Sequence, residues 1–374
     1  MKKEETIMIR PLKIPVAILT ATLVVALACG TVKKVFAEQW TPELARIIDG
    51  AKKEGKLRLT WGSSTLAGNQ GAQMAQALMN KMFGTNIQVM YSPGPSFARM
   101  GSKIAVEYSA GQNASTDVYL ASAPQIAPLL RRQIFQTVEW QKLLPRRITA
   151  KMIEGKNTAL IFGTGLSGAT YNSKLLPKGV VPRTMKDFLK PEWKGKIAST
   201  PYAASFDILA AKEIWGPEKT LDYVRKLSPQ LAGLIRCTEF ERIVSGEFVA
   251  IVMDCTGQEA LVWQEKGAPL KQLIPIDAAQ KRYRHLTVPK NAAHPNAAKL
   301  FTVFMMTEEG QKLAWKTWKI DLHFFPESKM RPKIDVLEKK GVKFYEATID
   351  FWLKHPGLGE VRKKVLKILR EAKR

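Results

Sequence analysis

The sequence predicts an α/β protein of two lobes, in which parallel-rich sheets are flanked by helices and joined by strands that cross between the lobes. Helical and strand patterns alternate along most of the chain, which is typical of sheets covered by helices on both faces. A nearly continuous apolar run from Phe248 to Asp254 indicates a strand buried on both faces. A length of 374 residues also favours two domains over a single core.

The elements of the first half are marked by local signals. Thr41, Pro42 and Glu43 have the pattern of a helix N-cap, a proline at the first helical position and an acidic first turn. The run from Lys56 to Trp61 alternates apolar and polar residues, which indicates a strand. We expect helices over 41–54, 71–83, 96–110 and 124–132, and strands over 56–61, 86–91 and 117–120.

The same alternation resumes in the second half of the chain. We expect strands over 196–199, 248–254 and 271–276, and helices over 205–215, 218–227 and 257–266. From Pro295 onward the pattern is mainly helical, with helices expected over 296–306, 308–318, 342–353 and 360–372. No internal repeat or long linker separates the two α/β units, so strands should connect the lobes directly.

The N-terminus has the pattern of a secretory signal peptide over residues 1–37. Basic residues precede an uncharged apolar segment, Ile14 to Cys29, and Val35 and Ala37 fit positions −3 and −1 of a cleavage site. Two alternatives stay open. In the first, the segment is retained as a membrane anchor, although its 16 residues are fewer than the about 20 that span a bilayer. In the second, Cys29 is acylated as in a lipoprotein. We expect a periplasmic protein.

The composition is strongly basic. The net charge is +25, and removal of the six Lys or Arg and two Glu residues of the leader lowers it to +21. Such a charge attracts anions, which favours an anionic solute, although a solvated basic surface is the plainer explanation. Because the basic residues are scattered and no aromatic-rich basic motif is present, nucleic-acid binding is not expected.

Cys237 and Cys255 are the two cysteines beyond the leader. Export to an oxidising compartment permits a disulfide between them. The first lies before a predicted helix and the second ends a predicted strand, so that they can meet at one sheet edge. Spacing alone does not fix the geometry that a disulfide needs, so the sequence does not decide whether Cys237 and Cys255 are bonded.

Polar turns occur at four predicted strand ends or helix starts. Ligands bind at the carboxyl ends of parallel strands, so these turns are candidate binding segments. Helix N-termini at such places suit carboxylate, phosphate or sulfonate groups. For any single hydroxyl, the alternative is a plain helix cap. The candidate ligand-binding residues are Ser63, Ser64, Ser122, Ser205, Thr256 and Gln258 in the turns, with Tyr202 and Tyr283 as candidate walls of the site.

No motif indicates catalysis or a cofactor. Gly163, Gly165 and Gly168 have the spacing of a dinucleotide-binding fingerprint, but a strand-like run follows them where a helix is required. We therefore expect these glycines to act as a hinge between the lobes. The four histidines lack partners at metal-ligand spacing, and phosphate-loop and hydrolase motifs are absent. We expect no enzymatic activity, no cofactor and no metal site.

The stretch from Pro182 to Ile197 is the most distinctive in the chain. Thr184 is placed to cap a helix with Asp187 at its third position, and Pro191 ends that helix. This stretch closely resembles one in the iron(III)/thiamine-type extracellular solute-binding proteins of ABC importers. Further segments match that family in the same order along the chain, at 171–175, 266–269, 288–299 and 307–311.

The resemblance implies a type II periplasmic-binding-protein fold, with two parallel-rich sheets flanked by helices and joined by crossover strands. On this basis residues 38–165 and 288–374 form lobe 1, with a helical C-terminal tail, and residues 166–287 form lobe 2. The resemblance also implies a monomer that captures a small-molecule ligand by hinge closure. The closed form would deliver that ligand to a membrane permease with its ATPase.

One departure from the family concerns the cargo. Ferric-binding members carry a Tyr-Tyr pair after the buried strand of the second lobe, at a position that corresponds to Gly257, Gln258 and Glu259 here. The absence of tyrosine there favours a small, anionic organic solute over ferric iron. A ferric-binding protein, a ligand sensor of the same fold and an enzyme on the same scaffold are the alternatives.

Overall fold

The structure is a computed structural model that describes residues 40–176, 180–203 and 205–371. The predicted signal peptide, with Cys29, lies outside the described residues. No helix within the described ranges has the length and apolar character that a bilayer span requires.

The first elements form a small parallel sheet with helices against it. α2 (Pro42–Glu54), β1 (Lys56–Trp61), α3 (Gly68–Phe83) and β2 (Gln88–Pro93) follow in order, and β1 pairs with β2 in parallel. α2 and β1 fall where the sequence predicted them. α4 (Phe97–Ser109), β3 (Tyr119–Ala121), α5 (Ala123–Leu130), α6 (Trp140–Leu143) and β4 (Ile153–Glu154) follow.

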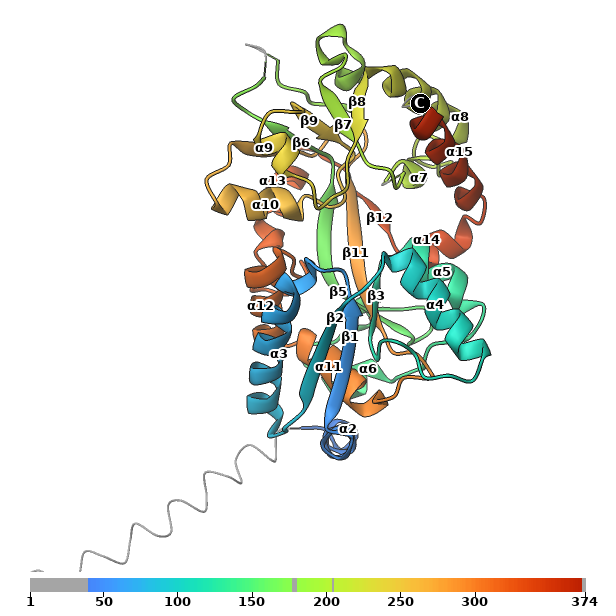
Figure 1. Cartoon of the computed structure of the whole chain (residues 1–374), viewed down its shortest axis with the longest axis vertical. Helices are drawn as coiled ribbons and strands as arrows, with labels where there is room; N and C mark the ends of the chain where they lie inside the picture. Colours follow the sequence, from blue (N-terminus) through green and yellow to red (C-terminus); the bar gives the residue numbers. More distant parts are fainter. Residues whose placement is uncertain (1–39, 177–179, 204, 372–374) are drawn as a thin grey trace, which may run out of the picture. The chain divides into compact units, whose positions relative to one another are not determined.

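Two long strands connect the halves of the fold. β5 (Ala159–Ser167) and β11 (Gln280–Thr287) pair antiparallel along their length, and every residue of both strands is buried. Figure 1 shows them side by side, running from the part that contains β1 and β2 towards the part that contains β6, β7 and β9. β4, β12 (Tyr345–Ala347) and β3 complete their sheet, with β3 antiparallel to β11. β3 therefore does not extend the parallel pair of β1 and β2.

A second five-stranded sheet lies between β5 and β11 in the sequence. Its order is β10-β6-β9-β7-β8, and it mixes parallel with antiparallel pairs. The chain enters it directly from β5 through Gly168, in keeping with the expected crossover. Its strands are β6 (Ala169–Asn172), β7 (Ile197–Ser199), β8 (Leu231–Leu234), β9 (Ala250–Val252) and β10 (Leu270–Leu273). Its helices are α7 (Phe206–Leu209), α8 (Pro217–Leu227), α9 (Glu241–Val244) and α10 (Gln258–Glu265).

Single 3-10 turns connect several of these elements. The turn over Met185–Leu189 carries the predicted capping box, in which the hydroxyl of Thr184 lies 2.9 Å from the Asp187 carboxylate. The other turns are Thr65–Ala67, Ala150–Met152, Pro191–Trp193 and Ser228–Gln230.

The C-terminal region departs most from the sequence prediction. α11 (Pro295–Met305) and α12 (Glu308–Trp318) are close to their predicted positions. The helix expected over 342–353 is instead β12, which pairs in parallel with the start of β11, followed by α14 (Ile349–Lys354). α13 (Met330–Lys339) was not predicted, and α15 (Leu358–Glu371) closes the described chain.

α15 lies against the second sheet's helices, although the sequence analysis placed all of 288–374 with lobe 1. Val361, Val365 and Leu369 recur every four residues on one buried face of α15. This stripe belongs to a core shared with α7 and α8, which α15 contacts. Arg362, also on α15, forms an ion pair with Asp207 of α7. The C-terminal segment thus reaches both parts of the fold, since α14 packs on α5.

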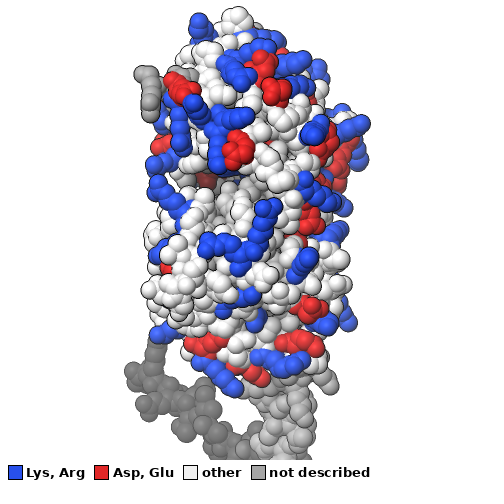
Figure 2. Space-filling model, turned by 90° about the vertical axis from the view of Figure 1, so that its right-hand side faces the viewer, with Lys and Arg blue, Asp and Glu red and all other residues white. Residues whose placement is uncertain are grey.

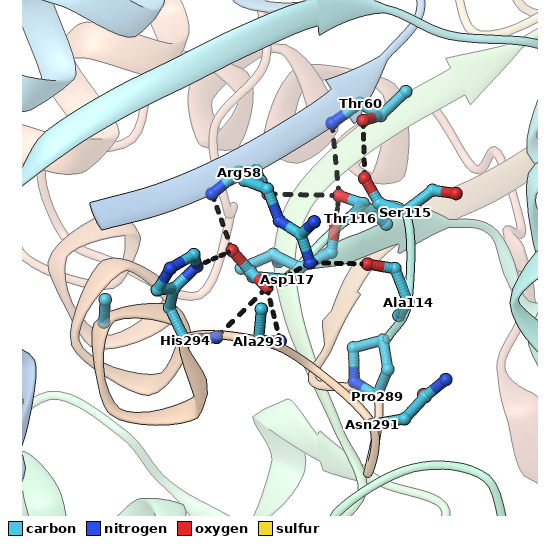
Figure 3. A network of polar contacts seen from close by, with 12 residues as sticks. Arg58, Thr60, Ala114, Ser115, Thr116, Asp117, Pro289, Asn291, Ala293 and His294 are labelled. Atoms are coloured by element: carbon cyan, nitrogen blue, oxygen red, sulfur yellow. Dashed lines mark hydrogen bonds and ion pairs between the residues drawn. The ribbon is translucent and has the colours of Figure 1, made fainter. Parts of the chain in front are cut away.

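A buried carboxylate fixes β1 relative to β3 and to the start of α11 (Figure 3). Asp117 is fully buried and accepts hydrogen bonds from the backbone N–H groups of Arg58 at 2.7 Å and Ala293 at 2.9 Å. The imidazole of His294 adds a contact of 2.8 Å through Nδ1, and the Arg58 guanidinium lies 3.5 Å away. This network joins β1 to the segment just before β3, and these two strands lead into the loops at Gly62 and Ser122.

The basic surface predicted from the composition is visible in Figure 2. On the face shown, Lys and Arg side chains extend from one end to the other, with Asp and Glu among them. The scattered arrangement agrees with the sequence, in which no single basic run occurs.

Candidate functional site

The candidate site is a cavity of about 350 Å³ at the strand ends of both sheets. Loops after β1 and β3 and the start of α4 line one side, and loops after β7, β8 and β9 line the other. β11 passes through the wall, and Trp318 and Arg362 from the C-terminal region complete it.

Five of the eight predicted site residues lie along this cavity. They are Ser64, Ser122, Tyr202, Thr256 and Gln258. They come from four different loops that follow strands, which is where the rule for ligand sites in parallel sheets leads us to expect them.

Ser63, Ser205 and Tyr283 do not line the cavity. Ser63 is exposed beside Ser64. Ser205 is fully buried, where its hydroxyl accepts a hydrogen bond of 2.8 Å from Arg282 and lies 2.6 Å from the hydroxyl of Ser167. Tyr283 alternates with the arginines of β11, so the pleat turns it to the opposite face, where its ring is parallel to that of His323 at 6.1 Å.

Two buried arginines of β11 were missed by the sequence analysis. Arg282 and Arg284 are two residues apart on a strand, so both side chains lie on one face, and both line the cavity. Each residue is only 7% exposed, and the Nε atom of each has no hydrogen-bond partner within the part of the chain that the structure describes. The signal in the sequence is an Arg-x-Arg pattern within residues 280–287, a stretch that is not among the predicted strands.

Arg284 is held by hydroxyl groups from both sides of the cavity. Its guanidinium donates to Ser122 Oγ at 2.7 Å and to Thr256 Oγ1 at 3.3 Å. Thr256 in turn is hydrogen bonded to the amide oxygen of Gln258, which orients its hydroxyl. The rings of Phe97 and Trp318 lie 5.7 and 6.0 Å from the guanidinium carbon, so the charge is surrounded by hydroxyls and aromatic faces.

No carboxylate among the described residues lies within ion-pair distance of Arg282 or Arg284. Burial lowers the pKa of Arg284 to about 9, and the positive charge of Arg282 adds to this effect. Burial also lowers the pKa of Arg282, while Asp207 opposes that shift. Asp207 itself is paired with Arg362. Buried cations ordinarily have a charged partner, so this wall is electrostatically incomplete.

A disulfide stabilises the opposite wall. Cys237, after β8, and Cys255, after β9, are bonded with their Cα atoms 6.0 Å apart, and both line the cavity. The bridge therefore ties the loop of Thr238 to that of Thr256. The structure thus contains the Cys237–Cys255 disulfide, which the spacing of the two cysteines alone did not decide.

We expect a double variant, Cys237→Ser with Cys255→Ser, to lose about 3 kcal/mol of unfolding free energy. The bridge closes a loop with a sequence separation of 18 residues, and loops near that length give about this value in the chain-entropy account. Urea unfolding monitored by circular dichroism measures the change. Wild-type protein unfolded with a reductant should match the variant, and equal stability of oxidised wild type and variant would contradict the expectation.

In the ranges 40–176, 180–203 and 205–371, no group of three or more His, Cys, Asp and Glu side chains is arranged to hold a metal ion. Among the described residues, Tyr202 is the one tyrosine that lines the cavity.

Fold and cavity together define a class, that of binding proteins whose ligand site lies between two α/β units joined by crossover strands. The family model for bacterial extracellular solute-binding proteins matches residues 73–329. The chain therefore belongs to this family of solute-binding transport proteins, which are not enzymes, and its fold is of the type II periplasmic-binding class.

Three solved structures illustrate the likeness. A substrate-binding protein of an ABC transporter from Agrobacterium tumefaciens aligns with a TM-score of 0.69 and 17% identity, covering 86% of this chain and 97% of that one. AfuA from Actinobacillus pleuropneumoniae, with fructose-6-phosphate bound, aligns with a TM-score of 0.64 and 20% identity, covering 85% of this chain and 99% of that one. Iron-bound HitA from Pseudomonas aeruginosa aligns with a TM-score of 0.64 and 17% identity, covering 85% of this chain and 99% of that one. Proteins of this fold thus bind chemically different ligands, and the fold does not identify the ligand of this chain.

Proposed function

We propose that this protein is the periplasmic solute-binding component of an ABC importer and that it captures a small, anionic organic solute. The observation that carries the proposal is Arg284, a buried cation that lines the cavity and has no carboxylate partner among residues 40–176, 180–203 and 205–371. An anion in the cavity would supply the missing charge. A charge-assisted hydrogen bond in a site lined by aromatic rings is stronger than one in water.

In this proposal the two lobes close on the solute about β5 and β11. Lobe 1 comprises 38–165 and 288–374 and lobe 2 comprises 166–287, with α15 of the C-terminal tail packed on lobe 2. The glycines at 163, 165 and 168 lie in or next to β5, where a hinge between the lobes would be required. The closed monomer would then deliver the solute to a permease and its ATPase.

Ferric iron is the less favourable cargo. A cation entering the cavity would meet the guanidinium groups of Arg282 and Arg284 with no tyrosine pair to bind it. Like charges in a buried site repel strongly, whereas an anion is attracted by the same groups.

A thermal-shift screen of the mature protein tests the proposal. Millimolar carboxylates, phosphate esters, phosphonates and sulfonates are compared with neutral sugars, thiamine-like compounds and ferric iron. We expect only anions to raise the melting temperature, because a ligand at 100 times its Kd stabilises the folded state by about 2.7 kcal/mol. Arg225→Gln, an exposed arginine of α8, is the control variant and should respond like wild type. A shift produced by ferric iron alone would contradict the proposal.

A further inference from the structure

The charges around Arg282 and Arg284 indicate how much negative charge the bound solute carries. Three arginines, Arg282, Arg284 and Arg362, line the cavity, and the acidic groups that act on Arg282 are Asp207 and Asp254. The carboxylate of Asp207 is committed to the Arg362 guanidinium and is shared with Arg282 through a longer-range interaction. Neither Arg282 nor Arg284 therefore has a carboxylate in ion-pair contact within the described part of the chain.

The other nearby carboxylates have closer partners elsewhere, although Asp254 acts on Arg282 at longer range. Asp254 accepts hydrogen bonds from the backbone N–H of Gly168 at 3.3 Å and the hydroxyl of Thr170 at 2.6 Å, and Lys333 is the strongest of the cations acting on it. Glu259 also lines the cavity, but the charges that act on it are those of Lys266 and Glu241. Neither acid is in ion-pair contact with Arg282 or Arg284.

From this arrangement we infer that the solute carries a doubly charged –PO₃ group, a terminal phosphate monoester or a phosphonate, which binds at Arg282 and Arg284. The inference rests on the proposed function and adds the chemical class of the solute. A dianion neutralises both guanidinium groups at once, whereas a carboxylate or sulfonate leaves one buried cation unpaired.

The donors at this position also fit a group with three oxygens. The guanidinium of Arg284 and the hydroxyl of Ser122 are hydrogen bonded to each other, and Arg282 lies two residues along the same strand face. The hydroxyl of Thr256 accepts from Arg284 and donates its hydrogen to Gln258, so it orients Arg284 and is not a donor to the solute. Guanidinium groups bind phosphate oxygens through paired N–H donors. A tetrahedral –PO₃ group offers oxygens in three directions, whereas the two oxygens of a carboxylate lie in one plane with its carbon.

Ethyl phosphate and ethyl sulfate provide a matched pair of probes. They have the same shape and the same tetrahedral head, but at pH 8 the phosphate carries about two charges, because its second pKa is about 6, and the sulfate carries one. Isothermal titration calorimetry measures both affinities on the mature wild-type protein. We expect ethyl phosphate to bind at least tenfold more tightly, and ethylphosphonate in a third arm shows which source of the –PO₃ group is preferred.

Arg282→Gln is the diagnostic variant. It should reduce the ratio between the two affinities to near one, because one of the two arginine charges is lost, while Arg282→Lys retains part of the preference. Arg225→Gln should leave the ratio unchanged. Melting temperatures of the ligand-free variants show whether each one folds, and the lysine variant keeps the test valid if the glutamine variant does not.

The outcomes separate this inference from the proposed function. Equal or tighter binding of ethyl sulfate would overturn the dianion while leaving an anionic solute intact. Binding of propionate but of none of the three –PO₃ or sulfate probes would do the same. Failure of every anion to bind, with a response to neutral or cationic compounds, would overturn the proposed function itself.

Discussion

Replacing Arg284 by glutamine is expected to weaken anion binding by 100-fold or more and to raise the melting temperature of the ligand-free protein. The loss of binding follows because removal of one partner of a buried, hydrogen-bonded charge pair costs about 2–5 kcal/mol. Calorimetry with the anions that stabilise the wild type measures this change.

The gain in stability has a separate physical cause. The Arg284 guanidinium is buried beside Arg282 without a carboxylate, and a buried ion carries a desolvation penalty of several kcal/mol. The two hydrogen bonds lost to Ser122 and Thr256 contribute about 1 kcal/mol each. A net gain of about 1 kcal/mol corresponds to a rise of about 2–4 °C.

The two readouts together distinguish a ligand-binding arginine from a structural one. Replacing an arginine with a purely structural role would lower the melting temperature. Replacing an arginine whose charge is unpaired until a ligand binds would raise it, which is a common conflict between function and stability. Arg225→Gln should change neither quantity. Unaltered anion affinity in Arg284→Gln would remove this residue from the site.

Asp117→Asn is expected to lose about 3–5 kcal/mol of unfolding free energy, the largest stability effect that we predict. The carboxylate is fully buried and serves the N–H groups of Arg58 and Ala293 and the imidazole of His294 (Figure 3). An asparagine offers one oxygen and turns an NH₂ group towards donors. Breaking a buried, hydrogen-bonded ion cluster from one side typically costs this much.

Urea unfolding of the variant beside wild type measures the loss. Asp222→Asn is the matched control, because Asp222 is exposed and its contact with Lys226 is a surface ion pair worth at most about 1 kcal/mol. A loss below 1 kcal/mol for Asp117→Asn would contradict the role given to this network.

Elements with local signals could be predicted from the sequence. α2 carries its cap, proline and acidic first turn within three residues, and β1 alternates regularly, so both were found with correct bounds. α13 was missed because Pro332 reads as a helix breaker, although it lies in the first turn, where the backbone N–H is not needed. β12 was missed because its pairing with β11 joins segments far apart in the sequence.

The candidate site could also be predicted only where local sequence signals mark it. The strand-end rule located Ser122 and Thr256, because the turns follow recognisable strands. It did not locate Arg284, because charged residues seldom occupy a buried strand and the stretch was not recognised as one. The prediction for Tyr283 is wrong because alternate residues of a strand point to opposite faces. Tyr283 lies between Arg282 and Arg284 and therefore faces away from the cavity.

A crystal structure of the protein with ethyl phosphate tests the central claim most directly. We predict electron density for the –PO₃ group in the cavity, with at least one oxygen about 2.7–2.9 Å from a guanidinium nitrogen of Arg284 and a second oxygen facing Arg282. A phosphate bound elsewhere, or one in the cavity that contacts neither arginine, would contradict the account.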